Sequence, residues 1–146
     1  ELIEGAALKK IKEFHFKIVG YDIDPVTLKK ANENIVAANL SEFVTLEHCD
    51  FFETEKGRDR QLFLVFNPPY DERISIDNVE RFYANIGNTL KRSYPDSQAW
   101  MITSNLEALK HVGLRPSKKI KLFNGKLESK LVQYEMYSGS KKAKKQ

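Results

Sequence analysis

The sequence predicts an α/β fold in which a mostly parallel β-sheet carries helices on both faces and ends in an antiparallel hairpin. Over most of the chain, short apolar runs that suit strands alternate with helical patterns, an order typical of parallel sheets. One run, residues 61–66, is apolar almost without interruption, as strands covered on both faces are. Near the end, residues 118–123 and 127–137 flank Asn124-Gly125, a strong signal for a tight turn. These observations favour a parallel sheet whose edge is an antiparallel hairpin.

The length of 146 residues suits one domain with a substantial core. Hydrophobic residues make up 41% of the chain, and no run of about twenty apolar residues is present that could span a bilayer. The chain starts at Glu1 with neither a Met nor a signal peptide pattern, so we expect an N-terminally truncated domain. We assign residues 1–137 to this partial domain and residues 138–146 to a basic tail, which we expect to be flexible.

Cysteine, histidine and charge narrow the class of protein further. Cys49 is the single cysteine, which excludes an internal disulfide and favours a reducing cytoplasm. The histidines His15, His48 and His111 are scattered, and we predict no metal site. Part of the net charge of +4 comes from lysines within residues 141–145, which could contact phosphates or simply keep the tail soluble.

The first part of the chain predicts a strand, a helix and two further strands. Residues 17–23 are rich in β-branched side chains and run directly into Asp24-Pro25, a helix N-cap and first-turn pair. Apolar residues then recur at helical spacing, namely Leu28, Ala31, Ile35 and Ala38. Asn39 is expected to end this helix. Residues 43–47 predict the second strand, and the apolar run at 61–66 the third.

The second part predicts a long helix from Asp77 to Lys91 and Arg92, two cations suited to a helix C-terminus. Its apolar residues recur at helical spacing: Val79, Phe82, Tyr83, Ile86 and Leu90. Residues 99–103 predict a fourth strand. Ser104 is expected to cap a short helix that runs to His111 and that Gly113 closes.

Acidic residues lie at the carboxyl ends of the first two predicted strands. Asp22 lies where ligands bind in open α/β sheets, and its carboxylate could accept both ribose hydroxyls of a nucleoside, with Ile23 beside it. Taken alone, Asp22 is better explained as a turn residue, and Asp24 as the helix cap. Asp50 ends the second strand, so its carboxylate could take the amine of adenine while Phe51 covers the ring. Asp50 could equally cap the following turn.

The tetrapeptide Asn67-Pro68-Pro69-Tyr70 is a more specific signal. An exocyclic amine must be held with its lone pair aimed at an incoming methyl group, which requires acceptors for its two hydrogens. The side-chain oxygen of Asn67 and the carbonyl of Pro68 can be these acceptors, stiffened by the two prolines. Tyr70 offers a flat face on which an extruded base can stack.

The same four residues could form an ordinary diproline loop with a core tyrosine. Their context favours chemistry, because the tetrapeptide follows a buried strand and two earlier strands end in acids at the same edge of the sheet. The sequence therefore predicts transfer of a methyl group from S-adenosylmethionine to an exocyclic base amine, with Asn67 to Tyr70 as the catalytic loop. Asp22, Ile23, Asp50, Phe51 and Asn67 are the predicted cofactor-binding residues.

Nearly the whole chain resembles a known family, the methyltransferase domain of THUMP-containing 23S ribosomal-RNA guanine-N2 methyltransferases, whose members also carry the description N6-adenine-specific DNA methylase. The matching segments are Gly20 to Pro25, Asn67 to Tyr70 with Glu72-Arg73, Phe82-Tyr83, Gly87 through Leu90-Lys91, Lys118-Lys119 and Asn124 to Glu128. The resemblance implies a Rossmann-like class I methyltransferase sheet. It also implies that Asp22 holds the cofactor ribose, Asp50 its adenine, and Asn67 to Tyr70 the target guanine of ribosomal RNA.

Two departures from the family pattern bear on activity. The family has Gly after the tyrosine where this chain has Asp71, an extra carboxylate near the RNA. The glycine-rich loop that cradles the methionine part of the cofactor is absent, as is the THUMP domain. The chain resembles the domain without its first strand, with residues 1–14 similar to the helix before the second strand. We therefore expect the fragment alone to be a weak or inactive enzyme.

Two other functions remain open at this point. The same tetrapeptide can hold the N6 amine of adenine in DNA or RNA, although the hairpin segment favours guanine in RNA. Alternatively, the chain could be a non-catalytic nucleic-acid-binding module that uses its basic tail and the lysines Lys118, Lys119, Lys121, Lys126 and Lys130. Lysines that alternate with apolar residues, as at 118–122, could also be just the solvated face of an edge strand.

Overall fold

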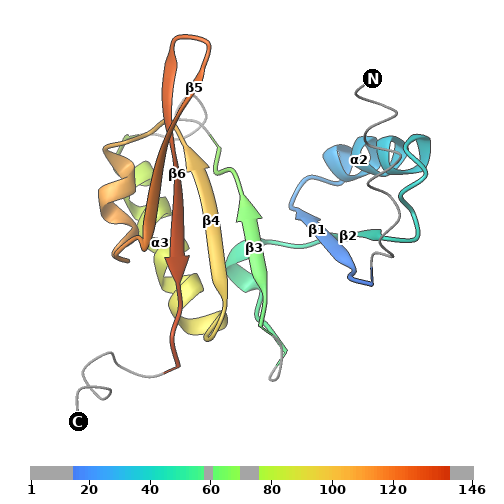
Figure 1. Ribbon diagram of the computed structural model, residues 1–146, viewed down its shortest axis with the longest axis horizontal. Coiled ribbons are helices and arrows are strands. Elements are labelled where there is room, and N and C mark those ends of the chain that lie inside the picture. Colours follow the sequence, from blue (N-terminus) through green and yellow to red (C-terminus); the bar gives the residue numbers. More distant parts are fainter. Residues whose placement is uncertain (1–14, 58–60, 70–75, 139–146) are drawn as a thin grey trace. The chain divides into compact units, whose positions relative to one another are not determined.

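A computed structural model of the chain describes residues 15–57, 61–69 and 76–138 (Figure 1). The chain forms two compact units, Glu1–Phe51 and Phe52–Gln146. The helix predicted within residues 1–14, the stacking residue Tyr70 and most of the basic tail lie outside the described residues. The boundary at residue 137 between domain and tail stays a prediction.

The first unit is a β-α-β element. Strands β1 (Ile18–Asp22) and β2 (Val44–His48) pair in parallel, and helix α2 (Pro25–Ala37) connects them. The helix begins as predicted, because the Asp24 carboxylate accepts a hydrogen bond from the Val26 amide at 2.9 Å and Pro25 takes the first helical position. It ends as predicted too, since Asn39 adopts a left-handed conformation with φ of 54°.

The second unit holds a mixed sheet of strand order β3-β4-β6-β5. Its elements are the strands β3 (Phe63–Phe66), β4 (Gln98–Thr103), β5 (Lys118–Asn124) and β6 (Leu127–Glu135), the helix α3 (Ile76–Ser93), and the 3₁₀ helices η1 (Phe51–Glu53, begun by the last residue of the first unit) and η3 (Ala108–Val112). β3 and β4 are parallel, whereas β6 runs antiparallel to both β4 and β5. The predicted hairpin is confirmed, but its two turn residues are Gly125 and Lys126 rather than Asn124 and Gly125, because Asn124 still pairs with Leu127. Gly125 supplies the left-handed conformation of this turn, with a φ of 62°.

The core of the second unit lies under one face of this sheet. Alternate residues of β4 are buried, with Ala99 and Met101 fully so, and Val132 beside them on β6 is fully buried as well. The Tyr83 hydroxyl of α3 forms a hydrogen bond of 2.6 Å with Thr103 Oγ1 of β4. Helix α3 therefore covers this face, as Figure 1 shows behind the strands.

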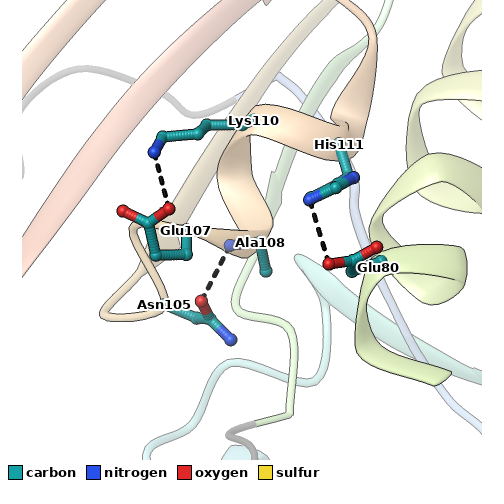
Figure 2. Close-up of polar contacts among 6 residues, drawn as sticks. All are labelled: Glu80, Asn105, Glu107, Ala108, Lys110 and His111. Carbon is teal, nitrogen blue, oxygen red and sulfur yellow. Dashed lines mark hydrogen bonds and ion pairs between the residues drawn. The ribbon is translucent and has the colours of Figure 1, made fainter. Parts of the chain in front are cut away.

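Some expectations need correction. Strand β3 was expected to be covered on both faces, but Phe63 and Val65 are 69% and 77% exposed, because β3 lies at the edge of the described sheet and α3 covers only one face. The short helix expected from Ser104 to His111 is the 3₁₀ helix η3, whose N-cap residue is Glu107 rather than Ser104. The Asn105 side chain accepts a hydrogen bond of 2.8 Å from the Ala108 amide at the start of η3 (Figure 2). Gly113 closes it with a φ of 68°, as predicted. The α/β class is confirmed, with the described strands in the sheets β1-β2 and β3-β4-β6-β5, one in each unit.

Candidate functional site

In the first unit, the ends of β1 and β2 lie side by side. Asp22 is the register partner of His48, and the Cys49 amide donates to the Asp22 carbonyl at 3.1 Å. One residue further, His48 Nε2 donates to the Ile23 carbonyl at 2.9 Å. The predicted site residues after the two strands thus lie at one edge of the small sheet, as parallel strands require.

The acid that ends β1, Asp22, and the acid that follows the strand, Asp24, have different roles. Asp24 is committed to the start of α2, because its carboxylate accepts hydrogen bonds from the Thr27 hydroxyl at 2.8 Å and from the Val26 amide. These bonds hold the pKa of Asp24 below its ordinary value. Asp22 Oδ1 accepts a hydrogen bond from the Asp24 amide at 2.8 Å. The turn role weighed for Asp22 is therefore observed, and within the described residues it engages Oδ1 of the carboxylate.

The remaining candidates of this edge differ in exposure. The Ile23 side chain is 64% exposed, as are its neighbours Tyr21 and Val26 at 50% and 59%. Asp50 follows β2 after Cys49, and both Asp50 and Phe51 are half-buried. Asp50 thus has a position and a burial suited to a contact with a bound ring.

In the second unit, Asn67 directly follows β3 at the carboxyl end of a parallel pair in which Phe66 is the register partner of Met101. The Asn67 side chain is exposed, Pro68 is buried and Pro69 is exposed. The buried proline holds the backbone at this point, because its ring fixes φ. Tyr70 lies outside the described residues, so its stacking role stays a prediction.

Sequence reasoning missed two positioning groups. His48 was considered only as a metal ligand, yet it ties the loop after β1 to the end of β2. At the end of β4, Thr103 Oγ1 binds the Tyr83 hydroxyl and also accepts from the Asn105 amide at 3.1 Å, which holds the loop that leads to η3. Nothing in the sequence marks these pairs, since Tyr83 and Thr103 are twenty positions apart.

The described residues include no group of three or more His, Cys, Asp or Glu side chains that could hold a metal ion. In the same part of the chain, every helix is too short or too polar to cross a bilayer.

Comparison with known proteins gives consistent matches. The family model described as RMKL-like, methyltransferase domain, matches residues 3–133. A ribosomal RNA large subunit methyltransferase K/L from Cellvibrio japonicus is 34% identical over 124 residues, which is 82% of this chain and 16% of that protein. The protein of the same name from Hahella chejuensis is 33% identical over 98% of this chain and 20% of its own length. The chain thus spans about a fifth or less of these relatives.

Comparison with solved structures also finds methyltransferases and methylases. A possible methylase from Clostridium difficile 630 is 31% identical with a TM-score of 0.79, covering 94% of this chain and 36% of that one. A predicted N6-adenine-specific DNA methylase from Listeria monocytogenes is 29% identical with a TM-score of 0.67, covering 82% and 30%. SMU.472, crystallised with SAH, shares the fold at 24% identity with a TM-score of 0.80 over 94% and 36%. The fold is the Rossmann-like class I methyltransferase fold, and the chain belongs to the RMKL-like methyltransferase domain family.

Proposed function

We propose that this chain carries residues for S-adenosylmethionine-dependent methyl transfer to an exocyclic amine of a ribosomal RNA base, with guanine N2 as the target. The observation that carries the proposal is the position of Asn67-Pro68-Pro69 at the carboxyl end of β3, in a member of a methyltransferase domain family. Ligands of open α/β sheets bind at this edge.

The proposed chemistry is positioning of the amine. Asn67 Oδ1 and the Pro68 carbonyl accept the two hydrogens of the amine, which directs its lone pair away from them and toward the methyl donor. Such orientation of two reactants accounts for a large share of the rate in reactions of this kind. Tyr70 stacks on the extruded base. After transfer the amine loses one proton to solvent or to a nearby acceptor, and no covalent enzyme intermediate forms.

The edge of the first unit suits the nucleoside part of the cofactor. When bound, S-adenosylmethionine supplies an activated methyl group. Asp22 would accept hydrogen bonds from the ribose hydroxyls with the oxygen that the Asp24 amide does not use. Asp50 would accept the adenine amine, and Ile23 and Phe51 would contact the ring system.

The names of the relatives support ribosomal RNA as substrate. Both the Cellvibrio japonicus and the Hahella chejuensis proteins are ribosomal RNA large subunit methyltransferases. An RNA substrate of this kind places the proposed activity in the cytoplasm, where the single Cys49 would stay reduced.

Adenine N6 is the second candidate target. It is favoured by the Listeria monocytogenes relative, whose description is an N6-adenine-specific DNA methylase. Asn67 and the Pro68 carbonyl can accept the hydrogens of an adenine amine in the same way, so the product of the reaction distinguishes the two targets.

The test uses a chimera in which this chain replaces its matching segment in the Hahella chejuensis relative. The chimera is incubated with labelled S-adenosylmethionine and unmodified ribosomal RNA, and the digested nucleosides are separated. We expect label in N2-methylguanosine, and a loss of at least about a hundredfold in rate for Asn67→Ala, since removing one oriented hydrogen-bonding group costs on this order.

The matched control is Asn88→Ala, which removes an exposed asparagine from helix α3. This variant should methylate at the unchanged rate. Label in N6-methyladenosine would move the assignment to adenine, and equal rates for Asn67→Ala and the control would overturn the role of the loop.

A further inference from the structure

The β5–β6 hairpin carries a concentrated positive charge. Residues 115–130 hold six Lys and Arg side chains and one acid, a net charge of +5. Residues 1–114 hold fourteen Lys and Arg against eighteen Asp and Glu, a net charge of −4. Residues 131–146 add four Lys and one Glu, a net charge of +3, so the positive charge of this protein is concentrated in the hairpin and the residues that follow it. Segregated charge of this kind attracts polyanions.

The register of the hairpin divides these lysines between its two faces. Lys121 is the direct cross-strand partner of Lys130. Lys119 lies two residues before Lys121 and therefore on the same face, about 6.8 Å away along the strand. Phe123 follows two residues later on this face, opposite Glu128. We call Lys119, Lys121, Lys130 and Phe123 the hairpin lysine face.

This arrangement opposes the stability of the hairpin. Like charges directly opposite each other in an antiparallel pair are destabilising. Glu128 offsets part of the charge through an ion pair of 2.8 Å with Lys121. Glu107, the acid near Lys130, is engaged by Lys110 at 2.5 Å (Figure 2). The positive charges of Lys119, Lys121 and Lys130 are therefore only partly neutralised by nearby acids. Folding of the hairpin does not require such a cluster of like charges.

The same face presents an aromatic surface. The Phe123 side chain is 63% exposed, and Lys121 Nζ lies 5.1 Å from the centre of its ring. β4 pairs only with residues 130–135 of β6, so the tip of the hairpin extends beyond β4 (Figure 1). Lysines beside an exposed aromatic ring on a projecting ribbon match the combination that single-stranded nucleic acids bind, with phosphates on cations and a base on the ring.

We propose that the hairpin lysine face binds the phosphate backbone of RNA, with Phe123 as a platform for one unpaired base. The inference rests on the proposed function for the choice of RNA as the nucleic acid. It assigns to the hairpin a contact with the RNA chain, in addition to the contact that the loop at Asn67 makes with the target base. The lysines hold the RNA without reading its sequence, because phosphate contacts carry no sequence information.

The test measures binding of the 146-residue chain to a fluorescent single-stranded RNA as a function of salt, with no cofactor present. The variant is Lys119→Gln, Lys121→Gln and Lys130→Gln together. For single strands each lost phosphate contact reduces the slope of log affinity against log salt by about 0.7. We therefore expect the slope to fall by about two, and the affinity at 0.1 M salt to fall roughly a hundredfold.

Two further variants exclude trivial causes. The matched control replaces Lys17, Lys29 and Lys91 by Gln, since these exposed lysines lie outside the hairpin and their loss changes the net charge equally. It should keep most of the affinity and slope. Replacement of the three hairpin lysines by Arg keeps the charge and should restore binding, which separates lost contacts from lost folding. Phe123→Ala should weaken binding severalfold or more without changing the slope.

Equal losses of RNA affinity in the hairpin variant and the control would overturn the proposal. Binding would then depend on the net charge of the chain and not on the hairpin lysine face. Competition by polyglutamate as strong as that by RNA of equal charge would also overturn it, in favour of an acidic protein partner. Because the assay contains no methyl transfer, the hairpin result stands even if the chimera proves inactive. Conversely, an active chimera with no hairpin effect would refute only this inference.

Discussion

Gly87→Ala should strongly destabilise the second unit, although it replaces a poor helix former by the best one. Gly87 lies in the middle of α3 and is buried against η3. A Cβ atom at this position would come within 1.7 Å of the Val112 carbonyl oxygen and 2.8 Å of its carbonyl carbon. Both are backbone atoms, so no side-chain rotation can relieve the overlap.

The magnitude follows from two opposing effects. Alanine in place of glycine favours a helix interior by about 1 kcal/mol. Against this, an ordinary carbon–oxygen contact is about 3.3 Å, so α3 and η3 must separate locally by about 1.6 Å. A gap of about 1 Å already forfeits up to half of a dispersion contact. The neighbours Ile86, Leu90 and Val112 are almost completely buried and lose such contacts. Because overpacking costs about 1–3 kcal/mol or more, we expect a net loss of about 2 kcal/mol.

Urea unfolding of the chain measures this loss directly. The chain holds a single tryptophan, and Trp100 lies on β4 in the sheet that α3 covers, so its fluorescence reports on this unit. The control is Gly57→Ala, because a Cβ atom there meets nothing within 4 Å, and it should be neutral or slightly stabilising. An unfolding free energy of Gly87→Ala equal to or above that of the unsubstituted chain would refute the reasoning.

Two further pairs of measurements test the packing and the electrostatics. Tyr83→Phe removes the buried hydrogen bond to Thr103 and should lower the unfolding free energy by about 1 kcal/mol. Tyr134→Phe removes a buried hydroxyl that has no described hydrogen-bond partner, so it should leave the unfolding free energy unchanged or raise it. Urea unfolding measures both variants, and a larger loss for Tyr134→Phe than for Tyr83→Phe would contradict this expectation. The pKa of Asp24 is lowered chiefly by the Thr27 hydroxyl, so this carboxylate stabilises the folded state above its unfolded pKa of 3.8, and the contribution disappears as the pH falls through the lower folded value. In an NMR titration, Thr27→Val should raise the midpoint of Asp24 toward 3.8, and an unmoved midpoint would show that the hydroxyl is not the cause.

Some features of the candidate site could be predicted from the order of residues in the chain, whereas others depend on contacts between distant residues. Asp22, Asp50 and Asn67 lie at or just beyond the carboxyl ends of strands that the local pattern predicts, and parallel pairing brings strand ends of one sheet to a common edge. The positions of these residues are therefore accessible from the sequence. Their roles toward cofactor and base stay predictions. The bond from His48 to the Ile23 carbonyl links positions twenty-five residues apart and could not be predicted.

The sequence by itself determined the features that depend on neighbours within a few positions. Asp24 caps α2 because its carboxylate reaches the amide two residues on, and Asn39 and Gly113 end helical segments because their own backbones adopt left-handed conformations. Only the tertiary structure decided the features made by distant segments. These are the order β3-β4-β6-β5, the close approach that requires Gly87, and the opposition of Lys121 and Lys130. The physical reason is that hydrophobic periodicity specifies which face of an element is buried, whereas the partner that buries it depends on packing between segments far apart in the chain.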